Sequence, residues 1–429
     1  MGQRIGVALI GLGTVGSGVV QILEDAVGRD MRLQSVDLVG VAVRDLSKPR
    51  TVAIGSDRLT EDALTLIENP EVSIVIEVMG GVEKPYALIR RALELGKHVV
   101  TANKALLARH GQELFALAKA NRVQIRYEAA VCGGIPVLQP LQQCFGANRV
   151  TSAIGIVNGT TNYILTQMAD RSLAYTEALA EAQSLGYAEA DPRADVDGND
   201  AQEKIAILSS IAFRLPLPEL DQIYREGISA IALGDVRYAQ QLGFAIKLLA
   251  FAVRQSDGRI DLRVHPTLVP LEHPLSRVDG AFNAVVIEAD PVGQIMFYGP
   301  GAGGGPTASA VVSDVINICA ELAYPVQSAV AEAIDFPGYL PIGEVRTRFY
   351  IRLKAFDLPG VIGHFGRIFG DHGVSLESIV QKNPHGEAAE LVIITHNVQE
   401  SQMRSALDEI REGTYLKEFC TAIRVLPEG

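Results

Sequence analysis

Short apolar runs alternate with helical repeats along the N-terminal part of the chain. Ile5–Ile10 is an uninterrupted apolar run, which is typical of a parallel strand buried on both faces. A helical pattern follows it, and further runs continue the order strand, helix, strand. The pattern predicts a doubly wound α/β domain over residues 1–135, whose expected strands are Ile5–Ile10, Val36–Val43, Val72–Val78 and His98–Thr101.

The pattern changes after about Pro136, where long helical stretches separate the strand-like runs. This spacing indicates an α+β domain over residues 136–305 with a mixed or antiparallel sheet. A helix at about 306–325 follows the glycine-rich segment Gly299–Gly305 and is expected to complete the first domain. The expected strands are Val150–Val157, Ile260–Val269, Ala281–Ala289 and Gln294–Tyr298.

The C-terminal part predicts a small separate domain over residues 346–429. A linker rich in proline and glycine, Phe336–Gly343, precedes it. Apolar and polar side chains alternate over Phe349–Lys354, the pattern of a half-buried strand. The order of the elements that follow is β-α-β-β-α-β, which predicts a ferredoxin-like fold.

Composition and charge make several classes of protein and partner unfavourable. The 429 residues are 48% hydrophobic and 21% charged, and the net charge is −12, so nucleic acid and anionic membranes are disfavoured partners. No apolar run is long enough to span a bilayer. A strand pattern that begins at Arg4 leads us to expect no signal segment. Four widely separated cysteines, without metal-ligand spacing, favour a reduced, cytoplasmic setting.

A glycine fingerprint joins the first strand to the first helix. Glycines at the first, third and sixth positions of GLGTVG permit a tight turn, close approach of a pyrophosphate and close packing of helix on strand. The alternative is a glycine-rich turn that only packs. Because the flanking strand and helix stand where this fingerprint requires them, we expect a dinucleotide at Gly11, Gly13, Thr14, Val15 and Gly16.

The end of the second strand bears on the choice of dinucleotide. Val43 is followed by Arg44 and then by Asp45. A guanidinium at this point can pair with a 2′-phosphate, which favours NADP. In the alternative, Arg44 stacks on the adenine while Asp45 binds the ribose of NAD.

Two lysines stand where acid–base chemistry can occur. Lys104 follows the fourth strand, at the edge of the sheet where ligands of open α/β folds bind. It is therefore expected near the nicotinamide and is also a candidate cofactor-binding residue, although a surface lysine is the simpler interpretation. Lys204 lies four residues after Asp200 in a predicted helix and shares the apolar face of that helix. Desolvation there favours a proton-transfer group, and a buried Asp200–Lys204 ion pair without chemistry is the alternative.

Several motifs together resemble the homoserine dehydrogenase family, in the form that carries a C-terminal ACT domain. The longest motif runs from Ala182 to Lys204 and matches the family signature throughout. Thr101–Lys104, Asn158–Asn162 and Pro306–Asp314 also resemble family motifs. The resemblance covers essentially the whole chain.

The resemblance implies reversible hydride transfer between NADP or NAD and the couple of L-aspartate 4-semialdehyde and L-homoserine. It implies that Lys204 transfers the proton, that Lys104 shares this role or orients the substrate, and that the middle domain binds substrate and forms the dimer. The implied contacts are Glu189 to the substrate ammonium, Asp195 and Asp200 to the polar pocket, Gly159 and Thr160 to the substrate, and Gly303 to the cofactor.

The resemblance also implies a monovalent cation such as sodium and an effector site. The cation residues would be Glu128, Val131, Gly133 and Ile135, largely through backbone carbonyls. The ACT turn, with Asp357 and Gly360, would bind L-threonine as a feedback inhibitor of threonine, methionine and isoleucine biosynthesis. The alternative is an ACT domain that only dimerises, and a homodimer or homotetramer is expected.

Two other functions fit parts of the same pattern. Aspartate-semialdehyde dehydrogenase needs a thiolate nucleophile, and Cys132 has no base among its sequence neighbours. An amino-acid-binding regulator would have no use for Asp200 and Lys204 beside a dinucleotide fold. Turnover of homoserine with NADP separates the three functions.

Overall fold

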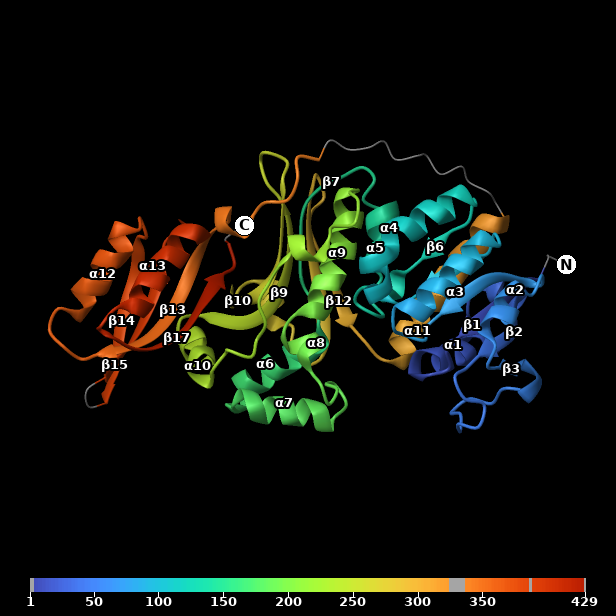
Figure 1. Ribbon diagram of the computed structural model, residues 1–429, viewed down its shortest axis with the longest axis horizontal. Coiled ribbons are helices and arrows are strands. Elements are labelled where there is room, and N and C mark those ends of the chain that lie inside the picture. Colours follow the sequence, from blue (N-terminus) through green and yellow to red (C-terminus); the bar gives the residue numbers. More distant parts are fainter. Residues whose placement is uncertain (1–3, 324–335, 386–387, 428–429) are drawn as a thin grey trace. The chain divides into compact units, whose positions relative to one another are not determined.

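The computed structural model describes residues 4–323, 336–385 and 388–427, which divide into two compact units (Figure 1). No helix in these ranges is long and apolar enough to cross a membrane. The predicted helix end at 324–325 lies outside the described residues. The first unit comprises Met1–Ala153, Glu203–Leu220 and Asn283–Asp335, and the second comprises Ile154–Gln202, Asp221–Phe282 and Phe336–Gly429.

A parallel six-stranded sheet forms the centre of the first unit. Its order is β3-β2-β1-β4-β5-β6, the order of a dinucleotide-binding doubly wound fold, as the sequence predicted. The strands are β1 (Ile5–Ile10), β2 (Val36–Ala42), β3 (Leu59–Thr60), β4 (Val72–Glu77), β5 (His98–Thr101) and β6 (Ile125–Arg126).

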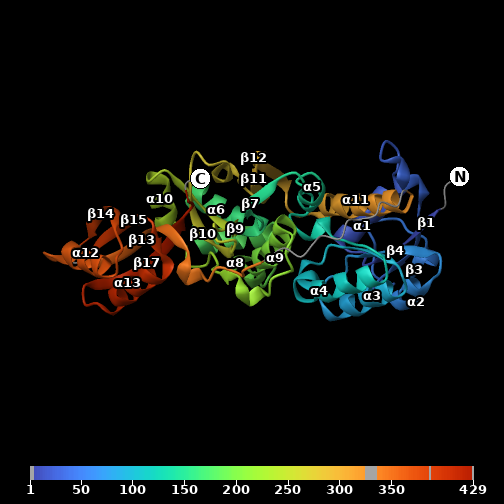
Figure 2. The same ribbon diagram turned by 90° about the horizontal axis from the view of Figure 1, so that it is seen from above.

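Helices cover this sheet on both faces. Helix α11 packs along α1, and the two lie side by side in both Figure 1 and Figure 2. A Cβ atom on Gly18 would lie 2.8 Å from the Cβ of Ala308, so the two helices approach closely. The helices of this unit are α1 (Thr14–Glu24), α2 (Ala63–Glu68), α3 (Glu83–Glu94), α4 (Lys104–Ala120), α5 (Leu138–Gln143) and α11 (Gly304–Ala323).

The first unit also contains most of β7 (Arg149–Ile156) and of β11 (Phe282–Asp290) and all of β12 (Gly293–Pro300), in the order β12-β11-β7. Each lies within two residues of its predicted bounds. Helix α11 begins at Gly304, two residues before its predicted start. One-turn helices lie at Met31–Ser35, Ser56–Arg58, Glu128–Ala130, Leu220–Gln222, Pro274–Arg277 and Ile342–Glu344.

The second unit combines helices with a long hairpin. Strand β9 (Phe244–Arg254) pairs antiparallel with β10 (Ile260–Pro270) over their whole lengths. No strand was predicted over β9, and Lys247 within it is buried. The other elements are α6 (Gly159–Arg171), α7 (Tyr175–Ser184), α8 (Arg193–Val196), α9 (Asn199–Phe213), whose C-terminal part belongs to the first unit, β8 (Tyr224–Arg225) and α10 (Leu233–Gln241).

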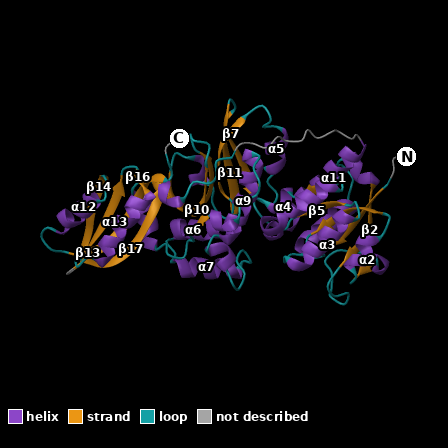
Figure 3. Ribbon diagram, turned by 45° about the horizontal axis from the view of Figure 1, so that its top comes forward, coloured by secondary structure: helices purple, strands orange, loops and turns teal. Residues whose placement is uncertain are grey.

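The C-terminal part of the second unit has the predicted β-α-β-β-α-β order. Helices α12 and α13 cover one face of its sheet, as Figure 3 shows, and bury the apolar side chains of β13. Its elements are β13 (Arg346–Phe356), α12 (Val361–Asp371), β14 (Leu376–His385), β15 (Ala388–Thr395), β16 (Val398–Gln399), α13 (Glu400–Glu412) and β17 (Leu416–Val425).

The opposite face of β13 is buried as well, which corrects the prediction of a half-buried strand. Tyr350 is fully buried and Arg352 is 7% exposed. The reason is α10, whose Asp235 receives the Arg352 guanidinium at 2.6 Å. Glu390 of β15 contacts the same guanidinium at 2.8 Å, so the charge is neutralised below the surface.

Strand β17 also pairs parallel with β10, at Thr267 opposite Arg424 and Leu268 opposite Val425. The Arg424 guanidinium, 5% exposed, binds Glu400 of α13 at 2.5 Å and Glu226 at 2.8 Å. The C-terminal domain is therefore hydrogen-bonded into the sheet of β9 and β10 and is not a module tethered only by the linker.

Replacement of Arg352 by methionine tests the contact between β13 of the C-terminal domain and α10. The variant leaves Asp235 buried without its counter-ion, and the free energy of unfolding should fall by roughly 3–5 kcal/mol. Differential scanning calorimetry should show a lower melting temperature. Arg367→Met is the matched control, because that side chain is 82% exposed and forms an ion pair with the exposed Asp371 on the same helix. Equal melting temperatures for the two variants would contradict the assigned role of Arg352.

Candidate active site

The loop after β1 has the geometry that dinucleotide phosphates require. Gly11 has a φ of +106°, and a Cβ atom there would lie 2.9 Å from the backbone of Val78 and Met79. A Cβ atom on Gly16 would lie 2.1 Å from the Gly11 carbonyl oxygen. A Cβ atom on Gly13 would have no neighbour within 4 Å. The first and third glycines are thus required for packing, while the second leaves open space at the N-terminus of α1, beside Thr14 and Val15.

The start of α11 meets the same loop. Gly303 has a φ of +117°, and a Cβ atom on Gly304 would lie 2.9 Å from the Thr14 methyl carbon. The structure therefore brings Gly303 beside the Gly11–Gly16 turn. Two helix N-termini converge there, and both present backbone N–H groups to an anion.

The polar groups after β2 are exposed. The Asp45 carboxylate accepts hydrogen bonds from the backbone N–H of Ser47 at 2.8 Å and from its hydroxyl at 2.6 Å. The Ser47 hydroxyl is the main cause that lowers the pKa of Asp45. One oxygen of this carboxylate is therefore engaged by its own turn, while the exposed Arg44 projects from the segment between β2 and that turn.

A buried carboxylate joins two loops at the end of the sheet where the fingerprint lies. Glu77, the last residue of β4, is 0% exposed and accepts hydrogen bonds from the Met79 N–H at 2.9 Å and the Thr101 hydroxyl at 2.7 Å. Burial raises its pKa. The Asn103 amide donates to the Gly81 carbonyl at 2.7 Å. Glu77 was not among the site residues predicted from the sequence, although a carboxylate that ends a buried parallel strand is a usable signal.

These bonds fix the start of α4, of which Lys104 is the first residue. Farther along α4, Arg109 forms an ion pair with Glu203 of α9 at 3.1 Å. The next residue of α9, Lys204, is 9% exposed, and Ile207 and Leu208 are also buried. Lys204 therefore lies on the inward side of its helix, as its spacing predicted.

The second unit gathers the predicted substrate-binding residues around the N-terminus of α6. The Asn158 side-chain amide donates to Asp195 of α8 at 2.7 Å and to Asp200 of α9 at 2.8 Å. The Thr160 hydroxyl donates to the Tyr187 carbonyl at 2.7 Å. Gly159 lies between Thr160 and Asn158, which is the N-cap of α6. Asn158 belonged to a predicted motif, but no role was predicted for it.

The loop that carries Glu189 is anchored on the same helix. Tyr187 packs against Tyr163 of α6 with ring centroids 4.8 Å apart. The Gln183 amide donates to the Glu189 carbonyl at 3.0 Å, while the Glu189 side chain is exposed. A carboxylate presented to solvent from an anchored loop can receive an ammonium group.

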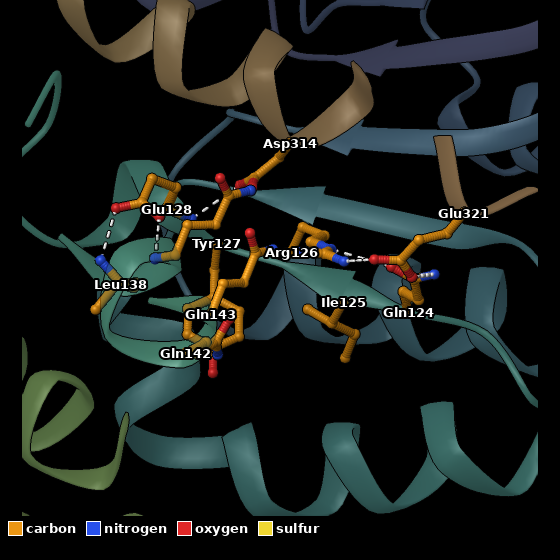
Figure 4. Close-up of a pocket in the computed structure, with 11 residues that line it drawn as sticks. Gln124, Ile125, Arg126, Tyr127, Glu128, Leu138, Gln142, Gln143, Asp314 and Glu321 are labelled. Atoms are coloured by element: carbon orange, nitrogen blue, oxygen red, sulfur yellow. Dashed lines mark hydrogen bonds and ion pairs between the residues drawn. The ribbon is translucent and has the colours of Figure 1, made fainter. Parts of the chain in front are cut away.

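The loop after β6 is held by two buried carboxylates (Figure 4). Glu128 accepts backbone N–H bonds from Val137, Leu138 and Gln139 at 2.7–2.8 Å, although burial raises its pKa. Asp314 of α11 accepts the Glu128 N–H at 2.8 Å, and burial raises the pKa of Asp314 to about 7. Both line a polar cavity of about 460 Å³.

The hydrogen bonds from residues 137–139 to the Glu128 carboxylate enclose the segment of the predicted cation site. Val131, Gly133 and Ile135 are buried. Backbone carbonyl oxygens are ligands that hard cations accept. Within the described ranges, no group of three His, Cys, Asp or Glu side chains could hold a metal. Cys132 is fully buried, which is unfavourable for a nucleophile.

The predicted effector turn lines a cavity of about 200 Å³ in the C-terminal domain. Gly360 adopts a φ of +90° and caps α12, so the backbone reverses at the helix N-terminus. The Asp357 carboxylate accepts the Gln381 amide at 3.1 Å. Apolar side chains such as Val361 and Leu391 complete the lining.

Three family models match the chain. The model for homoserine dehydrogenase matches residues 136–316, its NAD-binding domain matches 11–128, and the ACT domain matches 349–412.

A homoserine dehydrogenase of Synechocystis is 47% identical over 99% of this chain and 100% of its own. A crystal structure of the enzyme from Thiobacillus denitrificans matches with a TM-score of 0.93 and 41% identity over 100% and 99% of the two chains. A hyperthermophilic archaeal homoserine dehydrogenase in complex with NADPH matches with a TM-score of 0.62 and 28% identity over 75% and 99%.

Proposed function

Because the chain belongs to the homoserine dehydrogenase family, we propose that it catalyses reversible hydride transfer between NADP(H) and the couple of L-aspartate 4-semialdehyde and L-homoserine. The observation that carries this proposal is the buried side chain of Lys204, which lies one helical turn beyond Asp200. The carboxylates of Asp200 and Asp195 both accept hydrogen bonds from the side-chain amide of Asn158. An oxidoreductase of this kind needs a proton-transfer group and a polar pocket, and α9 contributes to both.

Reduction of the aldehyde requires a hydride at carbon and a proton at oxygen. The nicotinamide, when bound, supplies the hydride. Lys204 gives the proton to the carbonyl oxygen and takes it back in the reverse direction, with Asp200 beside the reacting oxygen. Lys104, fixed by the Thr101–Asn103 turn, shares this role or orients the substrate. The substrate-binding groups are Glu189 for the ammonium, and Asp195, Gly159 and Thr160 for the remaining polar contacts.

NADP is the proposed cofactor. Arg44 is exposed next to the end of β2 and can pair with a 2′-phosphate, whereas Asp45 is partly engaged by Ser47. The related archaeal enzyme was solved with NADPH. Gly11, Gly13, Thr14, Val15 and Gly16, together with Gly303, would hold the pyrophosphate.

We also propose a cation site, an effector site, an oligomeric state and a cellular location. The buried carbonyls of Val131, Gly133 and Ile135, with Glu128, would hold a structural monovalent cation such as sodium. Asp357 and Gly360 would bind L-threonine, which makes the enzyme a feedback-regulated step of threonine, methionine and isoleucine biosynthesis. A homodimer or homotetramer in the cytoplasm, without nucleic-acid or membrane partners, fits this role.

Initial rates of homoserine oxidation with each nicotinamide test the function. Lys204→Ala should lower turnover at least about a hundredfold, because general acid–base catalysis contributes that much or more. Affinity for the cofactor should change little. Lys119→Ala, an exposed lysine of α4, is the control. Near-normal turnover of the Lys204 variant would remove it from the mechanism, and wild-type protein that does not oxidise homoserine would refute the function.

Arg44→Ala tests the choice of cofactor. The loss of a charge-assisted hydrogen bond corresponds to roughly ten- to a hundredfold in affinity, so NADP should bind that much more weakly. NAD lacks the 2′-phosphate and serves as the internal control in the same titration. Equal weakening of both cofactors would make Arg44 a stacking residue.

Asp357→Ala tests the effector site. Threonine at millimolar concentration should inhibit the wild type about five- to a hundredfold, the usual range of coupling between sites. The variant should lose inhibition and keep its uninhibited rate, because Asp357 lies in the C-terminal domain. Asp371→Ala, at the other end of α12, should remain inhibited. No effect of threonine on the rate or melting temperature of the wild type would exclude threonine as the effector.

A further inference from the structure

Asn158 occupies a special position in the second unit, because one side chain contacts two helices besides its own. It is 4% exposed and precedes α6. Its Oδ1 accepts the N–H and the hydroxyl of Thr161, both at 2.8 Å, and so caps the helix. Its Nδ2 donates to Asp195 at 2.7 Å and to Asp200 at 2.8 Å. All the hydrogen-bonding capacity on both ends of this amide is engaged at the site.

The two carboxylates come from separate elements that other contacts hold in place. Asp195 belongs to α8, whose Val196 carbonyl accepts the Ile228 N–H at 2.8 Å. Gly198, with a φ of +82°, turns the chain from α8 into α9, and a Cβ atom there would lie 3.3 Å from Arg225. Asp200 follows in the first turn of α9. The backbone thus directs two like charges toward one nitrogen, where they repel each other unless a donor lies between them.

We propose that Asn158 is a positioning residue that sets the separation and orientation of the Asp195 and Asp200 carboxylates, and through them the fit of substrate and the placing of its reacting oxygen. This inference rests on the proposed function, because it takes the roles of the two aspartates from it. Asn158 itself need not touch the substrate.

The chemistry of the amide explains why asparagine stands here. A primary amide has two N–H donors on one nitrogen and an acceptor on the other end, so it can serve both carboxylates and cap α6 at once. Serine caps a helix as well but has a single donor on a shorter side chain. Aspartate also caps, yet it has no donor when ionised and adds a third negative charge. Alanine neither caps nor donates.

These differences separate the positioning role from the capping role. Asn158→Ser keeps the cap, so its melting temperature should stay close to that of the wild type, as should that of Asp62→Ser, an N-cap replacement at α2 that serves as the matched control. Steady-state kinetics of Asn158→Ser with homoserine should show KM raised and kcat lowered, and kcat/KM reduced about ten- to a hundredfold. Asn158→Asp should lose more than Asn158→Ser, and the dissociation constant of NADP should change little in either variant.

Double-mutant cycles identify the route of the effect. If Asn158 acts through the aspartates, Asn158→Ser should cost much less in a background of Asp195→Asn or Asp200→Asn than in the wild type. Additive effects, or an Asn158→Ser variant with kcat/KM within threefold of the wild type, would overturn the inference while leaving the enzyme's function intact. Wild-type protein that does not turn over homoserine would overturn both, since the inference depends on the reaction.

Discussion

A carboxyl or guanidinium group below the surface must be met by hydrogen-bond partners or by an opposite charge, and the arrangement of this protein depends on how that requirement is fulfilled. Glu77 is held by N–H groups from the loop after its own strand and by the Thr101 hydroxyl from the next one. Glu128 is held by the backbone N–H groups of Val137 and of the first two residues of α5. In each case the hydrogen bonds to the carboxylate tie together segments of the candidate site, so stability and site geometry rest on the same bonds.

The same requirement shapes the C-terminal domain. Arg352 projects from the face of the domain's sheet away from α12 and α13, and Asp235 of α10 supplies its carboxylate. Arg424 lies opposite Phe349 and binds Glu400 of α13, and Glu226 beside β8 adds a second carboxylate. Strand β17 adds backbone pairing to β10. An effector that shifts α12 against this sheet would therefore act on strands shared with the middle of the chain. A tethered module would have no such path.

Local patterns in the sequence predicted what local physics determines. The apolar run of β1, the glycines that follow it and the alternation in β13 fix strands and a turn within a few residues. The doubly wound sheet was confirmed, although its short edge strands β3 and β6 were not predicted. Strand β9 was missed because a strand buried on both faces has no alternation, and its apolar run also fits a buried helix. The burial of Arg352 depends on Asp235, which lies 117 residues away in the chain, and no local pattern contains that information.

The same contrast between local patterns and contacts of distant residues applies to the candidate site. Helical spacing placed Lys204 on the inward face of α9 because periodicity is a property of one element. It did not reveal Asn158 as the partner of Asp195 and Asp200, because that contact joins α6, α8 and α9 across 37 and 42 residues. Sequence motifs therefore identify the charged groups of such a site, whereas the neutral amide that holds them at a working distance becomes visible only when the helices are assembled. The neutral residue is also the better probe of geometry, because its replacement by serine leaves both charges and the helix cap in place.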